Sequence, residues 1–544
     1  MVTVLVASLI AGVVLLWTYR GLSFFYDEWD FIQNRRAWNP GAFLEPHNEH
    51  LVLLPAFIFK VLFSVFGIGS YWPYVVVLVI THVGCALVLY ALLRTWTSNE
   101  ISVAGTVVFL FIGTGWEVLL WPFEVSVTVS LATGLGALLA ARSESRTGDI
   151  AACVLLVTSL ASASLGIPFV VGVAILIATR PSAIRRLYIV AVPAVLYGAW
   201  YLLYAESSAK AANVQQIPVF VADSAAAAWA GVFGMNPEIG RAIMVASIVA
   251  VVLVVVKRLA DRAAIAALVT IPVVMWALLC LSRFGIATPS TPRYVYPGVA
   301  LMLALGALML GRKDASSIGA RVVIAVLLVS SLMTNVGVLK DGGKMWRDYS
   351  AQVTAGLGAM TLVQEEVPRD FQPNAQYAPQ VTAGPYFAAV AALGSPAMTP
   401  EEIAGATPPA RASADDVLRR AGVVALANAT ASTAAGSRPR PSVVTNGVAA
   451  GSGGPGCTTL NPTAPGEISA QVPVSAAGLE IRSTGAPVGV RVSAFGDPAP
   501  GEPLAVASPG GGVVTVTPRI VAGVPMWTVL ASSTASIVMC TMKR

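Results

Sequence analysis

The sequence predicts a polytopic α-helical membrane protein of about eleven spans that ends in an exported β-sandwich domain. Three observations lead to this prediction: 56% of the 544 residues are hydrophobic, only 11% are charged, and the mean hydropathy is +0.74. A soluble chain would carry about 25% charged residues. Most of this chain must therefore lie in a lipid bilayer. Beyond residue 457 the hydrophobic period changes to two, which indicates strands.

The predicted spans are apolar stretches that can cross about 30 Å of hydrocarbon, which takes roughly 20 helical residues. They cover residues 2–19, 73–93, 101–119, 122–141, 149–164, 166–180, 186–204, 241–257, 262–282, 293–311 and 319–339. A further apolar segment, 51–66, carries Lys60 and leads into an aromatic, turn-rich sequence, which is typical of an interfacial helix. On this assignment the cytoplasmic loops hold more Lys and Arg than the short outer loops. This bias predicts a plasma-membrane protein with a cytoplasmic N-terminus and a periplasmic or extracellular C-terminal domain.

Four regions are expected along the chain. Residues 1–340 form the transmembrane domain, with a first outer loop over 20–72. Residues 341–428 mix helical and turn-rich sequence and are expected to form an exported α-rich linker region. Residues 429–456 are rich in Ala, Ser, Gly and Pro, a composition that cannot bury a core, so we expect a flexible linker. In 457–544 apolar residues alternate with polar ones between Gly and Pro turns, which predicts the β-sandwich.

The five cysteines include no CxxC pair, which argues against zinc ribbons, thioredoxin-like sites and iron–sulfur clusters. Cys457 opens the β-rich region and Cys540 closes it, so a disulfide could join its two edge strands in an oxidising compartment. Closing a loop of about 80 residues would contribute about 4 to 5 kcal/mol by the loop-entropy model. Two unpaired buried thiols are the alternative.

Ionisable and aromatic side chains concentrate in the first outer loop. Asp27, Glu28 and Asp30 follow the first predicted span, and two of the three histidines fall in His47-Asn48-Glu49-His50. The same loop carries Phe24, Phe25, Tyr26, Trp29, Phe31, Trp38 and Phe43. A freely solvated loop would not need so many aromatic side chains. We therefore expect a walled cavity at the membrane surface in which a carboxylate acts as a base.

These features resemble the GT-C superfamily of integral-membrane glycosyltransferases, which use lipid-phosphate sugars as donors. The resemblance rests on Tyr26-Asp27-Glu28-Trp29-Asp30 after the first span, on Pro46-His47-Asn48-Glu49-His50, and on the interfacial helix ending at Phe66-Gly67. It covers about residues 1–340. It implies that Asp27, with Glu28 second, acts as general base on the acceptor hydroxyl or holds a metal that helps the leaving phosphate. The Ala- and Val-rich composition suggests an actinobacterial-type member.

The resemblance also implies an Arg-Tyr pair in a late outer loop, which Arg293-Tyr294 matches. Arg283 and Arg293 bracket that loop and run against the charge bias of outer loops, so we expect both to bind phosphate oxygens. Snorkelling to lipid headgroups is the alternative. The expected substrate-binding residues are Asp30, His47, Asn48, Glu49, His50, Glu117, Glu124, Arg283, Arg293 and Tyr294.

Glu117 and Glu124 lie beside tryptophans, and aromatic rings beside carboxylates suit sugar rings, although interfacial tryptophans are also ordinary in membrane proteins. His47 and His50, with Glu45 or Glu49, could hold a divalent metal, the one cofactor left open. Hydrogen bonds to sugars and helix caps are the alternative uses of such residues.

The sequence thus predicts a membrane glycosyltransferase for hexosyl or pentosyl transfer. It would move a sugar from a polyprenyl-phosphate donor to a cell-envelope glycan or lipid acceptor on the outer face. Its partners would be membrane lipid, donor and acceptor, and the β-sandwich would bind acceptor carbohydrate or act as a lid. Nucleic acid is not an expected partner, because the net charge of +6 is spread over short loops. The alternative is a multi-span transporter or flippase of a lipid-linked glycan, but we find neither related halves nor mid-membrane charges.

Overall fold

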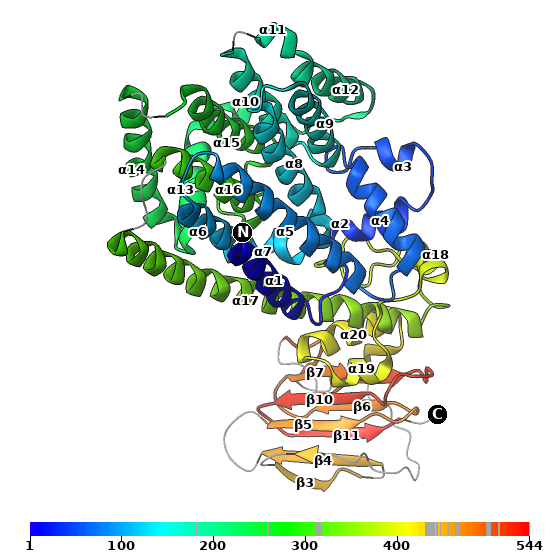
Figure 1. Cartoon of the computed structure of the whole chain (residues 1–544). Coiled ribbons are helices and arrows are strands. Elements are labelled where there is room, and N and C mark those ends of the chain that lie inside the picture. Colours follow the sequence, from blue (N-terminus) through cyan, green and yellow to red (C-terminus); the bar gives the residue numbers. More distant parts are fainter. Residues whose placement is uncertain are drawn as a thin grey trace. The chain divides into compact units, whose positions relative to one another are not determined.

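The computed structural model describes residues 1–180, 182–257, 260–311, 317–429, 441, 444–445, 448–454, 456–462, 468–496, 502–509 and 512–542. These residues form a helical region followed by a β-rich region (Figure 1). The chain divides into two compact units. We call Met1–Arg20 with Asn34–Trp346 the helical unit, and Gly21–Gln33 with Arg347–Arg544 the C-terminal unit.

The helical unit consists of helices of very different lengths. Its α-helices are α1 (Val2–Thr18), α3 (Gly41–Leu44), α4 (Leu53–Phe66), α5 (Trp72–Arg94), α6 (Asn99–Leu110), α7 (Trp116–Leu120), α8 (Val125–Ala141), α9 (Arg146–Ser162), α10 (Gly166–Ala178), α11 (Ala183–Arg186), α12 (Tyr188–Tyr204), α13 (Ile217–Phe233), α14 (Pro237–Val256), α15 (Arg262–Arg283), α16 (Pro292–Leu310) and the first part of α17 (Ile318–Leu362). Three 3-10 helices join them: η1 (Gly113–Gly115), η2 (Pro122–Glu124) and η3 (Ala211–Gln216).

Side chains at the helix starts explain where several of these helices begin. Ser98, Ser145 and Asn236 each accept a hydrogen bond from the backbone N–H three residues further on, and Asp261 accepts from two such groups. Such caps satisfy N–H groups that have no partner inside the helix. The long helices then pack pairwise, with α5 against α8, α8 against α9, α10 against α15, and α13 against α14 and α16.

The chain is a multi-pass membrane protein, but with fewer spans than expected. Among the described residues, eight helices are long and apolar enough to cross a membrane, or nine if the bent pair α6 and α7 forms one span. The expected eleven included three helices that are shorter than 18 residues: α1 and α9, of 17 residues each, and α10, of 13. Conversely, the sequence missed the apolar helix Ala211–Phe233 because two glutamines and Asp223 interrupt its hydrophobic pattern. The orientation of the termini stays a prediction.

The C-terminal unit includes a short segment from the start of the chain. Gly21–Gln33, which the sequence assigned to the transmembrane domain, clusters with residues from Arg347 onward. Its helix α2 (Asp27–Asn34) buries Trp29 completely, with the Trp29 ring 5.9 Å from that of Tyr386. The Gln33 side chain donates to the carbonyl of Gln380 and accepts from the N–H of Thr382. Both hydrophobic packing and hydrogen bonds therefore join α2 to this unit.

The rest of the C-terminal unit contains the end of α17, three short helices and two antiparallel sheets. The helices are α18 (Ala383–Leu393), α19 (Pro400–Gly405) and α20 (Pro408–Arg420). The strands are β1 (Val424–Ala429), β2 (Val444–Thr445), β3 (Val448–Ser452), β4 (Cys457–Pro462), β5 (Ile468–Pro473), β6 (Leu479–Ser483), β7 (Val488–Ser493), β8 (Ala505–Ala507), β9 (Val513–Pro518), β10 (Thr528–Ser533) and β11 (Ile537–Thr541). One sheet has the order β1-β9-β6-β11-β4-β3 and the other β2-β5-β10-β7-β8.

The predicted fold class is confirmed in outline, with one correction at its boundary. The period-two pattern correctly predicted the β-rich C-terminal domain, because the strands alternate buried and more exposed residues, as β5 does. The domain begins earlier than residue 457, since β1 pairs with β9 and β3 pairs with β4. Strands β2 and β3 lie inside the expected flexible linker 429–456. Residues 430–440, 442–443, 446–447 and 455 of that linker lie outside the described residues.

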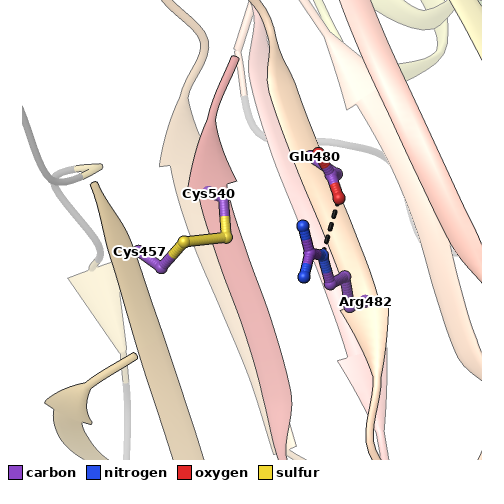
Figure 2. The surroundings of a disulfide bond; sticks show 4 residues. All are labelled: Cys457, Glu480, Arg482 and Cys540. Atoms are coloured by element: carbon purple, nitrogen blue, oxygen red, sulfur yellow. Dashed lines mark hydrogen bonds and ion pairs between the residues drawn. A yellow bond between two sulfur atoms is a disulfide. The ribbon is translucent and has the colours of Figure 1, made fainter. Parts of the chain in front are cut away.

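The predicted disulfide between Cys457 and Cys540 is present (Figure 2). It joins β4 to β11, and the two cysteines face each other directly in the strand register. The expectation that it ties two edge strands is wrong, because β4 and β11 each have a neighbouring strand on both sides. On the adjacent strand β6, Glu480 accepts from Arg482 at 2.6 Å.

Candidate functional site

The predicted catalytic acids lie in the first turn of α2, in the C-terminal unit. Acidic side chains there interact favourably with the positive end of the helix dipole. Glu28 is fully buried, and its Oε2 accepts a hydrogen bond from the Phe25 N–H at 2.8 Å. Asp27 and Asp30 are partly exposed. Glu28 thus closes the turn that starts the helix.

Tyr26, which precedes Asp27, has an unusual backbone conformation and a hydrogen bond to a distant segment. Tyr26 adopts a positive φ of 40°, which is uncommon for a residue other than glycine. Its hydroxyl donates to the carbonyl of Gln376 at 3.0 Å. Sequence reasoning missed Gln376 and its neighbour Tyr377, because no local pattern connects two segments 350 residues apart.

In the helical unit, Arg293 at the start of α16 faces Glu117 of α7. The Arg293 Nη1 lies 3.6 Å from the Glu117 Oε2, and Glu124 also interacts electrostatically with Arg293. The guanidinium lies 5.5 Å from the Tyr294 ring centroid, and 37% of the Arg293 side chain is exposed, so an external anion can still reach it. The Glu117 Oε2 is buried and receives no hydrogen bond from the described residues. The two side chains therefore form an ion contact, and the Arg293 backbone N–H also donates a hydrogen bond to the Glu117 carboxylate.

Two glycines allow the chain before Glu117 to approach its neighbours closely. A Cβ on Gly113 would lie 1.7 Å from the backbone oxygen of Asn335 in α17, and one on Gly115 would lie 2.9 Å from the Tyr296 ring in α16. Any larger residue would push this turn away from both helices. The glycines thus allow Glu117 to come opposite Arg293.

A buried hydrogen-bond chain fixes the same end of α16. The Tyr296 hydroxyl and the His82 Nδ1 are 2.8 Å apart, and the His82 Nε2 lies 3.2 Å from the carbonyl oxygen of Leu110. His82 belongs to α5 and is fully buried. This histidine connects α5, α6 and α16 and so supports the helix end that carries Arg293.

The His47-Asn48-Glu49-His50 segment forms a tight turn in the helical unit. The backbone groups of His47 and His50 exchange two hydrogen bonds, at 3.0 and 2.9 Å. Asn48 and Glu49 between them have φ values of 46° and 73°, as in a type I′ turn. The His50 Nδ1 lies 2.7 Å from the hydroxyl of Ser164.

Arg283, at the end of α15, holds this turn. Its Nη2 donates to the Asn48 carbonyl at 3.1 Å and lies 4.0 Å from the Glu49 Oε1. Arg283 thus contacts the histidine turn, and Arg293 contacts Glu117. Both arginines and their partners belong to the helical unit. Asp27, Glu28 and Asp30 belong to the C-terminal unit instead.

The histidine turn does not bring together a full set of metal ligands. Within the described ranges, no group of three or more His, Cys, Asp or Glu side chains is close enough to hold a metal ion. Because Ser164 bonds to the His50 Nδ1, that ring nitrogen is not available to a metal.

Comparisons with known proteins identify no family for the chain. No protein-family model matches it, and no curated protein matches it either. Among solved structures, it is similar to the crystal structure of ArnT from Cupriavidus metallidurans in the apo state, with 13% sequence identity and a TM-score of 0.45. That similarity covers 68% of this chain and 81% of that chain. A likeness this remote assigns neither a family nor an activity.

Proposed function

We propose that the chain is a GT-C-type membrane glycosyltransferase that moves a sugar from a polyprenyl-phosphate donor to a cell-envelope glycan or lipid acceptor. The observation that carries this proposal is Asp27, a partly exposed carboxylate at the first position of a helix that is firmly packed into its unit. A base needs a fixed position and access to the proton that it removes. Glu28 ranks second because it is buried and bonded to the Phe25 N–H.

The reaction assigns a separate role to each candidate group. Asp27 takes the proton of an acceptor hydroxyl, and the acceptor oxygen forms a bond to the anomeric carbon of the donor sugar. The bond from that carbon to the phosphate oxygen breaks, and the phosphate leaves with the electron pair. In the helical unit, Arg283 and Arg293 are proposed to bind the phosphate of the lipid-linked donor, because guanidinium groups bind phosphate oxygens through charge-assisted hydrogen bonds.

An apolar cavity in the helical unit supports a lipid-linked donor. Its volume is about 540 Å³, and residues of α5, α6, α13, α16 and α17 line it, among them Leu93, Trp229, Met302 and Leu327. A polyprenyl tail is a hydrocarbon chain that such a lining can accommodate. In the same proposal, the β-domain holds the acceptor glycan or acts as a lid.

The test is transfer by the purified full-length protein in nanodiscs. It would be offered a panel of radiolabelled polyprenyl-phosphate sugars together with a crude envelope acceptor. We expect labelled product with the wild type, a loss of about 100-fold or more in Asp27→Asn, and no loss in the exposed control Asp370→Asn. Absence of transfer from every donor by folded protein would contradict the proposal, and a lipid-flipping assay would then test the transporter alternative.

A further inference from the structure

The C-terminal unit contains a row of aromatic rings beside Asp27 that the proposed chemistry leaves unused. The Tyr349 and Tyr377 rings are stacked, with centroids 4.1 Å apart and planes at 18°. The Phe25 ring continues this row, because its centroid lies 6.3 Å from that of Tyr349 and the two ring planes differ by 12°. Tyr26 meets Phe25 edge-on at 4.6 Å. We call these four residues the aromatic shelf.

Three distant segments build the shelf. Phe25 and Tyr26 precede α2, Tyr349 lies on α17, and Tyr377 lies in the loop before α18. The Asn374 side chain accepts from the backbone N–H groups of Gln376 and Tyr377, which shapes that loop. The Tyr26 hydroxyl then bonds the loop to the segment before α2.

The three tyrosines of the shelf are more exposed than the aromatic residues around them. Trp29 and Tyr386 are fully buried and Phe25 is 6% exposed, whereas Tyr26, Tyr349 and Tyr377 are partly exposed and Gln376 is exposed. Partial burial, together with the neighbouring Tyr349 and Tyr26, raises the pKa of Tyr377. Its hydroxyl accepts a hydrogen bond from the side-chain amide of Gln376 at 2.9 Å. Packing alone does not require three tyrosines at a surface.

Backbone strain lies at the same place. Tyr26 holds its positive φ next to the residue that starts α2, and conformations of this kind cost about 1–3 kcal/mol and cluster at functional sites. The hydrogen bond to Gln376 and the edge-on contact with Phe25 maintain this conformation. The strain thus fixes the shelf and Asp27 relative to each other within one unit.

We propose that the aromatic shelf is a saccharide-binding subsite that holds a pyranose ring of the acceptor next to Asp27, an inference that rests on the proposed function. The apolar C–H face of a pyranose packs on an aromatic ring, as other apolar groups do. The Gln376 side chain, whose amide donates to the Tyr377 hydroxyl, and the tyrosine hydroxyls supply the polar groups that would hydrogen-bond the sugar hydroxyls. The acceptor hydroxyl is thereby brought to the carboxylate that removes its proton.

The first measurement needs no donor and therefore does not depend on the transfer reaction. Full-length protein in nanodiscs would be mixed with methyl glucoside, mannoside and galactoside and their disaccharides, and binding would be followed by saturation-transfer NMR. We expect a signal in the wild type that falls about tenfold or more in Tyr349→Ala and Tyr377→Ala. The signal should fall only about threefold in Tyr377→Phe, which keeps the ring but loses one hydroxyl. It should persist in Tyr201→Ala, which removes an exposed tyrosine stacked on Tyr197 in the helical unit.

Gln376→Ala provides a variant at an exposed position that preserves the backbone carbonyl bonded by Tyr26. It should weaken binding about threefold or more, through loss of one hydrogen-bonding group, while the melting temperature stays unchanged. This variant tests the shelf even if the alanine substitutions at the tyrosines disturb folding.

The second measurement is transfer kinetics in the same variants. The expected result is a KM for the acceptor that rises about tenfold with kcat within threefold of the wild type. Wild-type binding in all shelf variants, no saccharide signal at all, or a fall in kcat at unchanged KM would each overturn the inference. Saccharide binding that depends on the shelf without transfer from any donor would support the subsite while the proposed function fails.

Discussion

The helical unit and the C-terminal unit hold their candidate charges in different ways. In the helical unit each candidate arginine already has a partner, because Arg293 lies 3.6 Å from Glu117 and Arg283 donates to the Asn48 carbonyl at 3.1 Å. In the C-terminal unit the Glu28 carboxylate accepts a hydrogen bond from the backbone N–H of Phe25, and the neighbouring Asp27 is partly exposed. An anionic ligand that binds these arginines must therefore compete with acceptors of the protein.

The difference also divides the first outer loop, which looks continuous in sequence. Residues 21–33 cluster with the C-terminal unit, and residues from Asn34 onward cluster with the helical unit. Their charged groups can therefore be altered separately.

The largest effect is expected from the disulfide of the C-terminal unit. Replacing both cysteines in Cys457→Ser/Cys540→Ser should lower the free energy of unfolding of this unit by about 4 to 5 kcal/mol, because an 83-residue separation is no longer closed in the unfolded chain. Hydrogen exchange of the β4 and β11 amides measures the loss. Exchange in the helical unit should stay unchanged, as it should everywhere in the control Cys153→Ser. Equal exchange in the double variant and the wild type would show that the loop closure contributes nothing.

The next effect separates the two neighbouring acids of α2. Asp27→Asn should lower kcat by about 1000-fold, or about 4 kcal/mol, because it removes the base. Glu28→Gln should lower the stability of the C-terminal unit by about 1 to 2 kcal/mol, because it weakens a buried hydrogen bond to the Phe25 N–H. Kinetics and thermal melts of both variants measure the contrast. A large kcat loss in Glu28→Gln at full stability would exchange the two roles.

Local patterns in the sequence predicted much of this fold. The spans formed by α5, α8, α15 and α16 could be placed because each is a long apolar run. The cysteine pairing could be placed because Cys457 and Cys540 fall at the two ends of a period-two region. The helix Ala211–Phe233 was missed because its polar residues break up the apolar run, and β1 was missed because Val424–Ala429 is short and rich in alanine.

The candidate site could be predicted only as residue types. Acids and arginines at helix ends can be recognised along the chain, but their partners cannot. The contact between Arg293 and Glu117 depends on the close approach allowed by Gly113 and Gly115. The stacking of Tyr349 on Tyr377 depends on a loop conformation, which no local periodicity encodes.

A smaller effect is expected at the ion pair of Arg293 and Glu117, and its sign differs between two variants. Arg293→Gln should raise the KM for the donor about 30-fold, or about 2 kcal/mol, because a charged hydrogen-bond donor to phosphate is lost. Glu117→Gln should lower that KM by up to about fivefold, because it removes the carboxylate that competes with phosphate for Arg293. Donor titrations measure both. Arg241→Gln, an exposed arginine paired with Asp223 and Glu238, serves as control. A higher KM in Glu117→Gln would mean that the glutamate positions the arginine instead of competing for it.

The smallest effect concerns Asp415 of α20, which bonds to the end of β7 inside the C-terminal unit. Its carboxylate accepts from the Ser493 hydroxyl and from the N–H groups of Ala494 and Phe495. Burial raises the pKa of Asp415, and these hydrogen bonds and Arg411 oppose the rise only in part.

A pKa that is raised in the folded state means that the stabilisation is fully present below the ordinary carboxyl pKa of about 3.9 and is lost as the pH rises through the folded pKa. The C-terminal unit should therefore lose stability as the pH rises from acidic to neutral. Asp415→Asn should flatten that part of the pH profile, since an amide does not titrate but can still accept from both N–H groups. The measurement is the melting temperature of the wild type and the variant across the pH range. Asp416→Asn, at the more exposed neighbouring position, serves as the control. Identical profiles for Asp415→Asn and the wild type would mean that the three hydrogen bonds offset the cost of burial.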